Sequence, residues 1–286
     1  MEHMRALVVG GTGTLGRHVV ATLLRRGHDV RAHSRHPLKD EPDPADADAA
    51  AADDAPPAAL ALLGDLSTGA GLATALDGVD VVIDCSNINT TSGRKATAFF
   101  TNAAARLREA ERAAGVAHHV LVSIVGIDDI PYPYYLAKLA QEHAAAHSEP
   151  PVTILRSTQF MEFGPQVATR TSLGPLVFVP DWPVQPVAAA DVAEALADIA
   201  EAPPAGRAPD LGGPDLMRLP DLVRSTLAAR GTPERVVRIR VPGRAGRIMH
   251  AGGLLLGEGR CGPTTFAEFL SRLSRDASPG DATSGA

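Results

Sequence analysis

The sequence has few cysteines, few aromatic residues and no excess of positive charge. Its two cysteines, Cys85 and Cys261, are too few for the disulfide framework of a small secreted protein. The 27 lysine and arginine residues face 33 aspartate and glutamate residues, which argues against general nucleic-acid binding. No apolar run reaches the roughly 18 residues of a membrane span, and the N-terminal apolar run is too short for a signal peptide. These absences predict a cytoplasmic protein that binds neither membranes nor nucleic acid.

What the sequence does contain is enough apolar material for a large core. Hydrophobic residues make up 45% of its 286 residues, which fits one large domain or one domain with a small annex. The acidic charge is concentrated in residues 40–54, where seven acids occur without a base. Together with alanine and proline they predict a flexible, low-complexity loop over residues 38–59. A solvated linker and a recognition arm are both compatible with this loop.

Short apolar runs alternate with helical patterns in the first half of the chain. This order is typical of parallel βαβ units, whose strands are covered on both faces. It predicts a Rossmann-type doubly wound parallel sheet with a small C-terminal α/β substrate-binding region. Strands are expected at 6–9, 30–33, 60–63, 79–83, 120–123, 152–155 and 236–241, and helices at 15–26, 96–114, 134–146, 191–201, 219–230 and 266–273. The predicted divisions are a dinucleotide-binding domain at 1–156, a substrate region at 157–273 interleaved with it, and a disordered tail at 274–286.

A glycine-rich loop joins the first expected strand to the first helix. Gly10 permits a tight turn, Gly13 a close approach to a pyrophosphate, and Gly16 tight packing of helix on strand. The free N–H groups and dipole of the helix N-terminus favour phosphate. The loop therefore predicts nucleotide contacts from Gly10, Thr12, Gly13, Thr14 and Leu15.

The end of the second expected strand indicates which cofactor is used. An NAD site typically has a carboxylate there to hold the ribose 2′-hydroxyl. This chain has Ser34 and Arg35, which are suited to a 2′-phosphate, although Arg35 is also compatible with a solvated surface role. We expect NADP(H) to be preferred, with NAD(H) as a possible cofactor.

Two further loops follow the third and fourth expected strands. Asp65 is expected to accept from the adenine amine and Leu66 to cover the ring. The loop of Cys85, Ser86 and Asn87 is expected to pass beneath the ribose. Both loops lie at the carboxyl ends of strands, where open α/β sheets bind ligands.

Tyr134 and Lys138 are four residues apart on an expected helix and so share one face. A nearby ammonium favours tyrosinate, so it would lower the tyrosine pKa from about 10 toward neutrality. Such a tyrosine exchanges a proton with a carbonyl or alcohol oxygen, and Ser123 at the end of a strand would hold the same oxygen. The alternative is an ordinary amphipathic helix with an exposed lysine.

These motifs occur together with two later ones over residues 4–272. They are 10–16, Arg35, 64–66, 123–126, Tyr134-Tyr135-Leu136-Ala137-Lys138, Gln185-Pro186-Val187 and Asp191-Val192-Ala193. In this combination the chain resembles an atypical, extended short-chain dehydrogenase/reductase of the NmrA-like, NAD(P)H-binding group.

The resemblance implies roles for the matching residues. Tyr134 would be the proton donor, Ser123 its helper, and Lys138 the ribose anchor that tunes the tyrosine. Thr158, Gln159 and Phe160 would border the nicotinamide. The group also includes NADP-binding redox regulators without turnover, and its helices often form homodimers.

We therefore expect an NADP-dependent oxidoreductase that acts on a carbonyl or activated double bond of a small, moderately apolar metabolite. The first alternative is a non-catalytic NADP(H) sensor, and the second is an epimerase or dehydratase with tightly bound cofactor. No metal site is expected, because His143 and His147 have the spacing of metal ligands but no third ligand accompanies them.

Overall fold

The computed structural model describes residues 3–37, 59–88, 90, 92–147, 149–232 and 235–276. The low-complexity loop expected at 38–59 lies outside the described residues, except for its last residue. Within the described ranges no helix is both long enough and apolar enough to cross a membrane.

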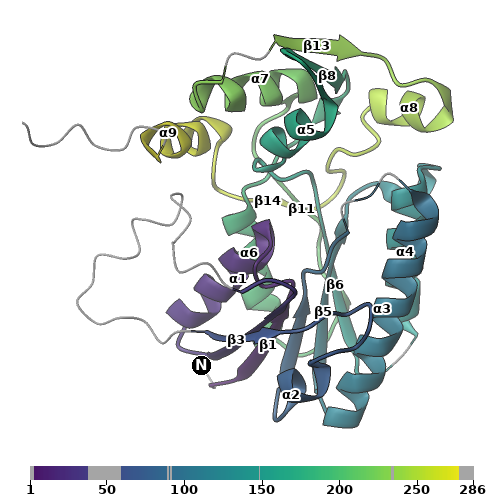
Figure 1. Cartoon of the computed structure of the whole chain (residues 1–286), viewed down its shortest axis with the longest axis vertical. Coiled ribbons are helices and arrows are strands. Elements are labelled where there is room, and N and C mark those ends of the chain that lie inside the picture. The colour runs from purple at the N-terminus through teal and green to yellow at the C-terminus, as the bar shows by residue number, and fades with distance from the viewer. Residues whose placement is uncertain are drawn as a thin grey trace, which may run out of the picture.

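A parallel sheet forms the centre of the larger lobe (Figure 1). Its strands lie in the order β14-β11-β6-β5-β4-β1-β2-β3, with β10 beside β6, and each of these pairs is parallel. The run from β3 to β6 has the doubly wound order, so the expected fold class is confirmed. The strands are β1 (Arg5–Val9), β2 (Asp29–Ser34), β3 (Leu60–Leu63), β4 (Val81–Asp84), β5 (His118–Ile124), β6 (Val152–Ser157), β10 (Gly206–Arg207), β11 (Leu211–Gly212) and β14 (Arg260–Cys261).

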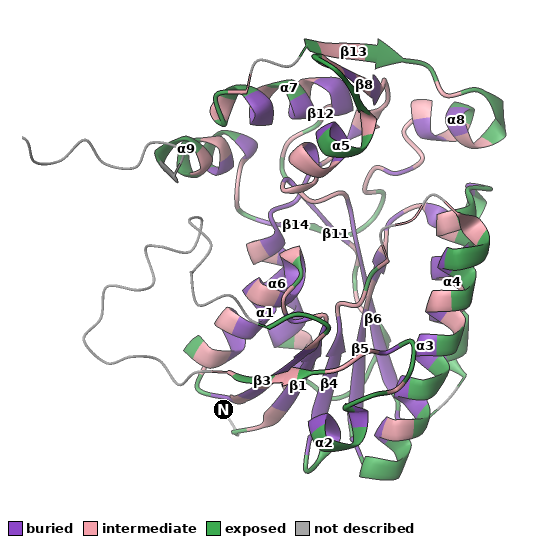
Figure 2. Cartoon of the chain, in the orientation of Figure 1, coloured by how far each residue is buried: buried purple, intermediate pink, exposed green. Residues whose placement is uncertain are grey.

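Helices cover both faces of this sheet, so its central strands are buried along most of their length (Figure 2). One face packs on α1 (Thr14–Arg25) and α6 (Ala189–Glu201). The other packs on α2 (Leu72–Leu76), α3 (Gly93–Ala114) and α4 (Pro133–Ala146). A 3-10 turn, η2 (Ile127–Asp129), joins β5 to α4.

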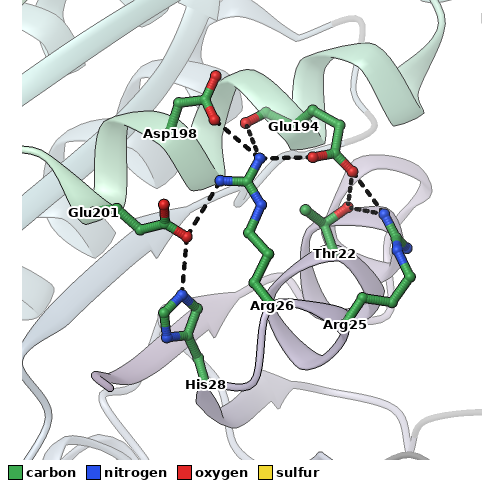
Figure 3. Close-up of polar contacts among 7 residues, drawn as sticks. All are labelled: Thr22, Arg25, Arg26, His28, Glu194, Asp198 and Glu201. Carbon is green, nitrogen blue, oxygen red and sulfur yellow. Dashed lines mark hydrogen bonds and ion pairs between the residues drawn. The ribbon is translucent and has the colours of Figure 1, made fainter. Parts of the chain in front are cut away.

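Helices α1 and α6 are also joined by a charged network (Figure 3). The guanidinium of Arg26 contacts Glu194 at 2.6 Å, Asp198 at 2.9 Å and Glu201 at 3.2 Å. His28 Nε2 lies 2.9 Å from the same Glu201 oxygen. The network ties the junction between α1 and β2 to a helix about 170 residues later in the chain.

The smaller lobe packs around its own apolar cluster above the sheet (Figure 1). It contains α5 (Phe163–Thr171), β7 (Ser172–Leu173), β8 (Leu176–Pro180), β9 (Pro183–Val184), β12 (Met217–Arg218), α7 (Leu219–Ala229), β13 (Arg235–Ile239), α8 (Gly243–His250) and α9 (Phe266–Asp276). Strand β13 pairs with β8 in a separate three-stranded sheet, and β12 pairs with β9.

Several of these elements differ from the sequence expectation. Helices α2, α5 and α8 and strand β8 were not expected, since α5 and α8 contain glycine and α5 also contains proline, which have low helix propensity. Packing of Val167 and Ala168 against β8 and α7 overrides that propensity. The expected tail is wrong for residues 274–276, because α9 continues to Asp276. Residues 277–286 lie outside the described ranges.

Segments from the second half return to the large lobe. Helix α6 and strands β10, β11 and β14 all follow residue 157 and yet build the central sheet or cover it. The proposed division at residue 156 stays a prediction, with the later segment interleaved through the sheet.

Candidate functional site

The glycine loop between β1 and α1 is built so that side chains are excluded from it. Gly10 has φ +77° and its N–H donates to His33 O at 2.8 Å. A Cβ on Gly16 would lie 2.1 Å from Gly10 O, so only glycine permits this approach of helix to strand. Helix α1 begins at Thr14, next to Leu15, which is buried, and Thr12, which is half-buried. The first turn thus presents backbone N–H groups at the edge of the sheet.

The loops after β2 and β3 lie next to each other because the strands pair through Ser34 and Leu63. The Ser34 hydroxyl donates to His36 O within its own loop, while Arg35 is exposed. Asp65 Oδ1 accepts from the Ser67 N–H at 2.8 Å and from its hydroxyl. These bonds from Ser67, with a smaller contribution from Arg35, hold the pKa of Asp65 below its usual range.

The expected contact of Leu66 with the adenine ring stays a prediction, and the structure shows the side chain in the core. It is 7% exposed and packs with Leu7, Leu72 and Leu76 under the sheet. Because the Leu66 side chain is part of this buried cluster, it anchors the loop that carries Asp65.

The loop after β4 contains Cys85, Ser86 and Asn87. Ser86 N–H donates to Asp84 Oδ1 at 2.8 Å, and Asn87 Oδ1 accepts from its neighbour Ile88 N–H at 2.7 Å. Burial raises the pKa of the Cys85 thiol, so this cysteine lacks the thiolate character of a redox-reactive residue. The loop is therefore fixed by its own polar groups.

Tyr134 lies in the first turn of α4, facing the loop after β4. Its hydroxyl donates to Asn87 Oδ1 at 2.7 Å, and its ring packs edge-on against Phe100 at 5.7 Å between centroids. Burial raises the pKa of Tyr134 to about 12. The expected lowering by Lys138 is wrong for this structure, because the lysine ammonium is directed to other oxygens.

Lys138 is 5% exposed and belongs to a buried chain of hydrogen bonds. Its Nζ donates to Val122 O at 2.8 Å and to Gln141 Oε1 at 2.7 Å. Gln141 Nε2 donates in turn to Asp84 Oδ2 at 3.0 Å, which links the helix to the end of β4. Burial lowers the pKa of Lys138 to about 8.

Sequence reasoning missed Asp84 and Gln141. Two signals were present: a carboxylate ends an otherwise apolar strand, and Gln141 stands three residues after Lys138 and so on the same helical face. Neither signal identifies its partner, because Asp84 and Gln141 are separated by 57 residues.

The remaining expected residues lie at the ends of β5 and β6, which are neighbours in the sheet. Ser123 is 2% exposed, and its Oγ has no hydrogen-bond partner in the described ranges. The Thr158 hydroxyl donates to Gln185 O, while Phe160 forms a β-bridge with Val187. The carboxamide of Gln159 is buried, and both of its polar atoms lack a partner among the residues described. Unpaired buried groups of this kind are costly unless a ligand satisfies them.

A cavity of about 380 Å³ lies between the loops after β2, β3 and β4 and helix α3. It is lined by Arg35, Ser67 and Asn87 from the loops and by Phe99 and Asn102 from α3. A larger hollow of about 610 Å³ is formed by residues 240–251 in the smaller lobe, but none of the expected site residues lines it. The first cavity has the location that open α/β sheets use for ligands.

The residues present fit a dinucleotide. The glycine loop has no room for side chains at Gly10 and Gly16, and its backbone N–H groups can bind a pyrophosphate. Arg35 and Ser67 line the cavity between the loops after β2, β3 and β4. Ser123 and Gln159 have buried polar atoms without a partner among the described residues. A model of a family described as NAD(P)H-binding matches residues 10–203, which is most of the chain. The chain belongs to this NAD(P)H-binding family.

Sequence relatives of this NAD(P)H-binding chain are reductases and dehydrogenases. An isoflavone reductase homolog from Zea mays is 46% identical over 83 residues, which cover 29% of this chain and 26% of the relative. A chloroplastic divinyl chlorophyllide a 8-vinyl-reductase from Oryza sativa subsp. indica is 31% identical over 223 residues, which cover 73% and 54%. The chain thus spans about half or less of the length of these curated relatives.

Solved structures share the fold at low sequence identity. A Thermotoga maritima UDP-glucose 4-epimerase with UDP-glucose is 16% identical with a TM-score of 0.70, covering 96% of this chain and 98% of the epimerase. A short-chain dehydrogenase/reductase superfamily protein from Agrobacterium tumefaciens with bound NAD is 18% identical with a TM-score of 0.64, covering 95% and 96%. The resemblance to the short-chain dehydrogenase/reductase fold is therefore confirmed.

Proposed function

We propose that this NAD(P)H-binding protein is an NADP-dependent oxidoreductase that reduces a carbonyl or activated double bond of a small, moderately apolar molecule. The observation that carries the proposal is the grouping of Tyr134, Lys138 and the unpaired Ser123 Oγ around the ends of β4 and β5. Reductase and dehydrogenase relatives support the reaction class.

Tyr134 acts as the proton donor in this proposal. Because burial raises its pKa to about 12, the hydroxyl is protonated at neutral pH and has a proton to give. Ser123 Oγ holds the substrate oxygen, and that hydrogen bond satisfies a group that is otherwise unpaired. The bound nicotinamide supplies the hydride.

The other residues bind and orient. The loop at 10–16 holds the pyrophosphate through its N–H groups, and Arg35 contacts the 2′-phosphate and so favours NADP over NAD. Lys138 orients the ribose from its position between Val122 O and Gln141. Thr158, Gln159 and Phe160 border the reacting end. Trp182 is half-buried and packs against two apolar clusters, one around Met161 and one around Met249, and in this proposal it forms part of the apolar substrate wall.

The test is NADPH oxidation over a panel of ketones, quinones and enones, with Tyr134→Phe and Tyr135→Phe compared. Tyr135 is the matched control, since it is adjacent and loses the same hydroxyl. We expect Tyr134→Phe to lower turnover about 100-fold or more and Tyr135→Phe to preserve it. NADPH binding should persist in both variants.

Three results would overturn the proposal. Full turnover in Tyr134→Phe excludes the tyrosine as the acid. NADPH binding without turnover over the panel favours a redox-responsive regulator. Substrate conversion without net NADPH loss favours an epimerase or dehydratase.

A further inference from the structure

Helix α3 contributes positive charge to the cavity beside the strand ends. Lys95 and Arg106 line it from α3, and Arg35 lines it from the end of β2. Among the residues described, no carboxylate lines the cavity and none of these three cations forms an ion pair. Three unpaired cations around one cavity favour an anionic ligand.

The two cations of α3 lie at different ends of this cavity. Eleven residues separate them, which corresponds to about 16 Å along a helix. Lys95 is in the first helical turn, where Gly93 packs so tightly on Pro133 that a Cβ would lie 2.4 Å from the proline Cβ. Lys95 is therefore at the Tyr134 end of the cavity.

Arg106 is at the opposite end, beside the loop after β3. A Cβ built on Gly69 would lie 3.6 Å from Arg106 Cδ, so the arginine stem runs along that loop. Arg35 lies near the same loop, because it follows Ser34, which pairs with Leu63, and its charge helps to lower the pKa of Asp65 in that loop. Ser67, in this loop, also lines the cavity.

We propose that Arg106 is the second cation that binds the 2′-phosphate of NADP, together with Arg35, and that the pair determines the choice of NADP over NAD. The inference rests on the proposed use of NADP and names a residue outside the strand-end position that usually sets this choice. A phosphate with charge near −2 accepts bonds from two guanidinium groups at once. The Ser67 hydroxyl already donates to Asp65 Oδ1, so in this proposal the two guanidinium groups hold the phosphate.

The experiment measures calorimetric binding of adenosine 2′,5′-bisphosphate and of 5′-AMP, which differ only in the 2′-phosphate. The variants are Arg106→Gln, Arg35→Gln and Arg112→Gln, the last being an exposed arginine of α3 that does not line the cavity. We expect Arg106→Gln to weaken the bisphosphate about tenfold and to leave 5′-AMP unchanged. Arg112→Gln should leave both unchanged. All variants are first compared with the native protein by circular dichroism and thermal melting.

The outcomes separate this inference from the proposed function. If the native protein prefers the bisphosphate and only Arg35→Gln removes that preference, NADP selection stands and the role of Arg106 is overturned. An equal loss of both ligands in Arg106→Gln also overturns it, because the residue then acts on the shared adenosine. If the native protein shows no preference, NADP selection fails and the role of Arg106 fails with it.

Discussion

Tyr134 and Asn87 are joined by a 2.7 Å hydrogen bond in which the tyrosine hydroxyl donates to Asn87 Oδ1. The bond connects the first turn of α4 to the loop after β4. Because Asn87 Oδ1 also accepts from Ile88 N–H, the carboxamide has a fixed orientation. The proposed proton donor is thus oriented by the loop that we propose lies beneath the cofactor ribose.

This relationship predicts that Asn87→Ala lowers turnover about tenfold, since the hydroxyl loses the partner that orients it. In the Tyr134→Phe background the same change should add little, because the oriented group is already absent. The measurement is a double-mutant cycle on the kcat of the best substrate in the panel. Independent, multiplicative losses from the two changes would contradict the coupling.

Lys138 predicts a specific dependence of stability on pH. Burial lowers its pKa to about 8 in the folded protein, whereas an unfolded lysine has a pKa near 10.4. Between these values the unfolded chain binds more protons, so stability gains from this group as pH rises from 8 to 10.

Lys138→Met removes this titration. The difference in unfolding free energy between native protein and variant should shift in favour of the native protein by about 2–3 kcal/mol between pH 7 and pH 10. Urea unfolding at several pH values measures it, and subtraction cancels the groups that both proteins share. A difference that stays flat over this range would show that Lys138 titrates at its ordinary pKa.

Gly16 and Tyr134 illustrate which features of the site can be predicted from the sequence and which cannot. Spacing predicted the glycine loop because a phosphate-binding turn imposes local backbone geometry that only certain residues meet. Spacing also placed Tyr134 and Lys138 on one face. It did not give the direction of the Lys138 ammonium, which depends on Val122 O and Gln141 Oε1, nor the burial that raises the Tyr134 pKa.

The same distinction holds for the fold. Seven strands and the long helices were predictable because their apolar runs are continuous or periodic. Helix α5 was not, since its sequence contains glycine and proline and it depends on packing against α7 and β8. Properties set by distant partners thus required the structure.

Gln141 belongs to no sequence motif, yet we expect its substitution to lower the unfolding free energy substantially. Its carboxamide joins Lys138 Nζ to Asp84 Oδ2, and all three side chains are buried. Gln141→Leu leaves one ammonium hydrogen and one carboxylate oxygen without this partner, which should cost about 2–4 kcal/mol of unfolding free energy.

The matched control is His143→Leu, an exposed position on the same helix, where the change should stay within about 0.5 kcal/mol. Thermal or urea unfolding compares the two variants. Equal, small effects would mean that Lys138 and Asp84 find other partners in the variant, and would contradict a stabilising role for the link between α4 and the end of β4.

The network between α1 and α6 predicts a loss of stability that depends on pH (Figure 3). Burial alone would raise the pKa of Glu194 and Glu201, but hydrogen bonds from Arg26 and His28 outweigh it, so both pKa values lie below the usual range. Carboxylates with lowered pKa values stabilise the fold above their unfolded pKa, near 4.3, and lose this contribution as pH falls through the folded pKa.

Arg26→Gln should therefore lower the unfolding free energy by about 1–2 kcal/mol at pH 7, because one guanidinium serves three carboxylates. Arg25→Gln is the matched control, since Arg25 is more exposed and pairs with Glu194 alone, and its effect should be smaller. The difference in unfolding free energy between native protein and Arg26→Gln should narrow as pH falls from about 4.3 through the lowered pKa values of the folded protein, because the carboxylates become protonated over this range. Urea unfolding at pH 7 and pH 3.5 measures the difference in unfolding free energy between the two proteins. If this difference is the same at both pH values, the contribution of Arg26 comes from packing of its aliphatic stem rather than from its charge.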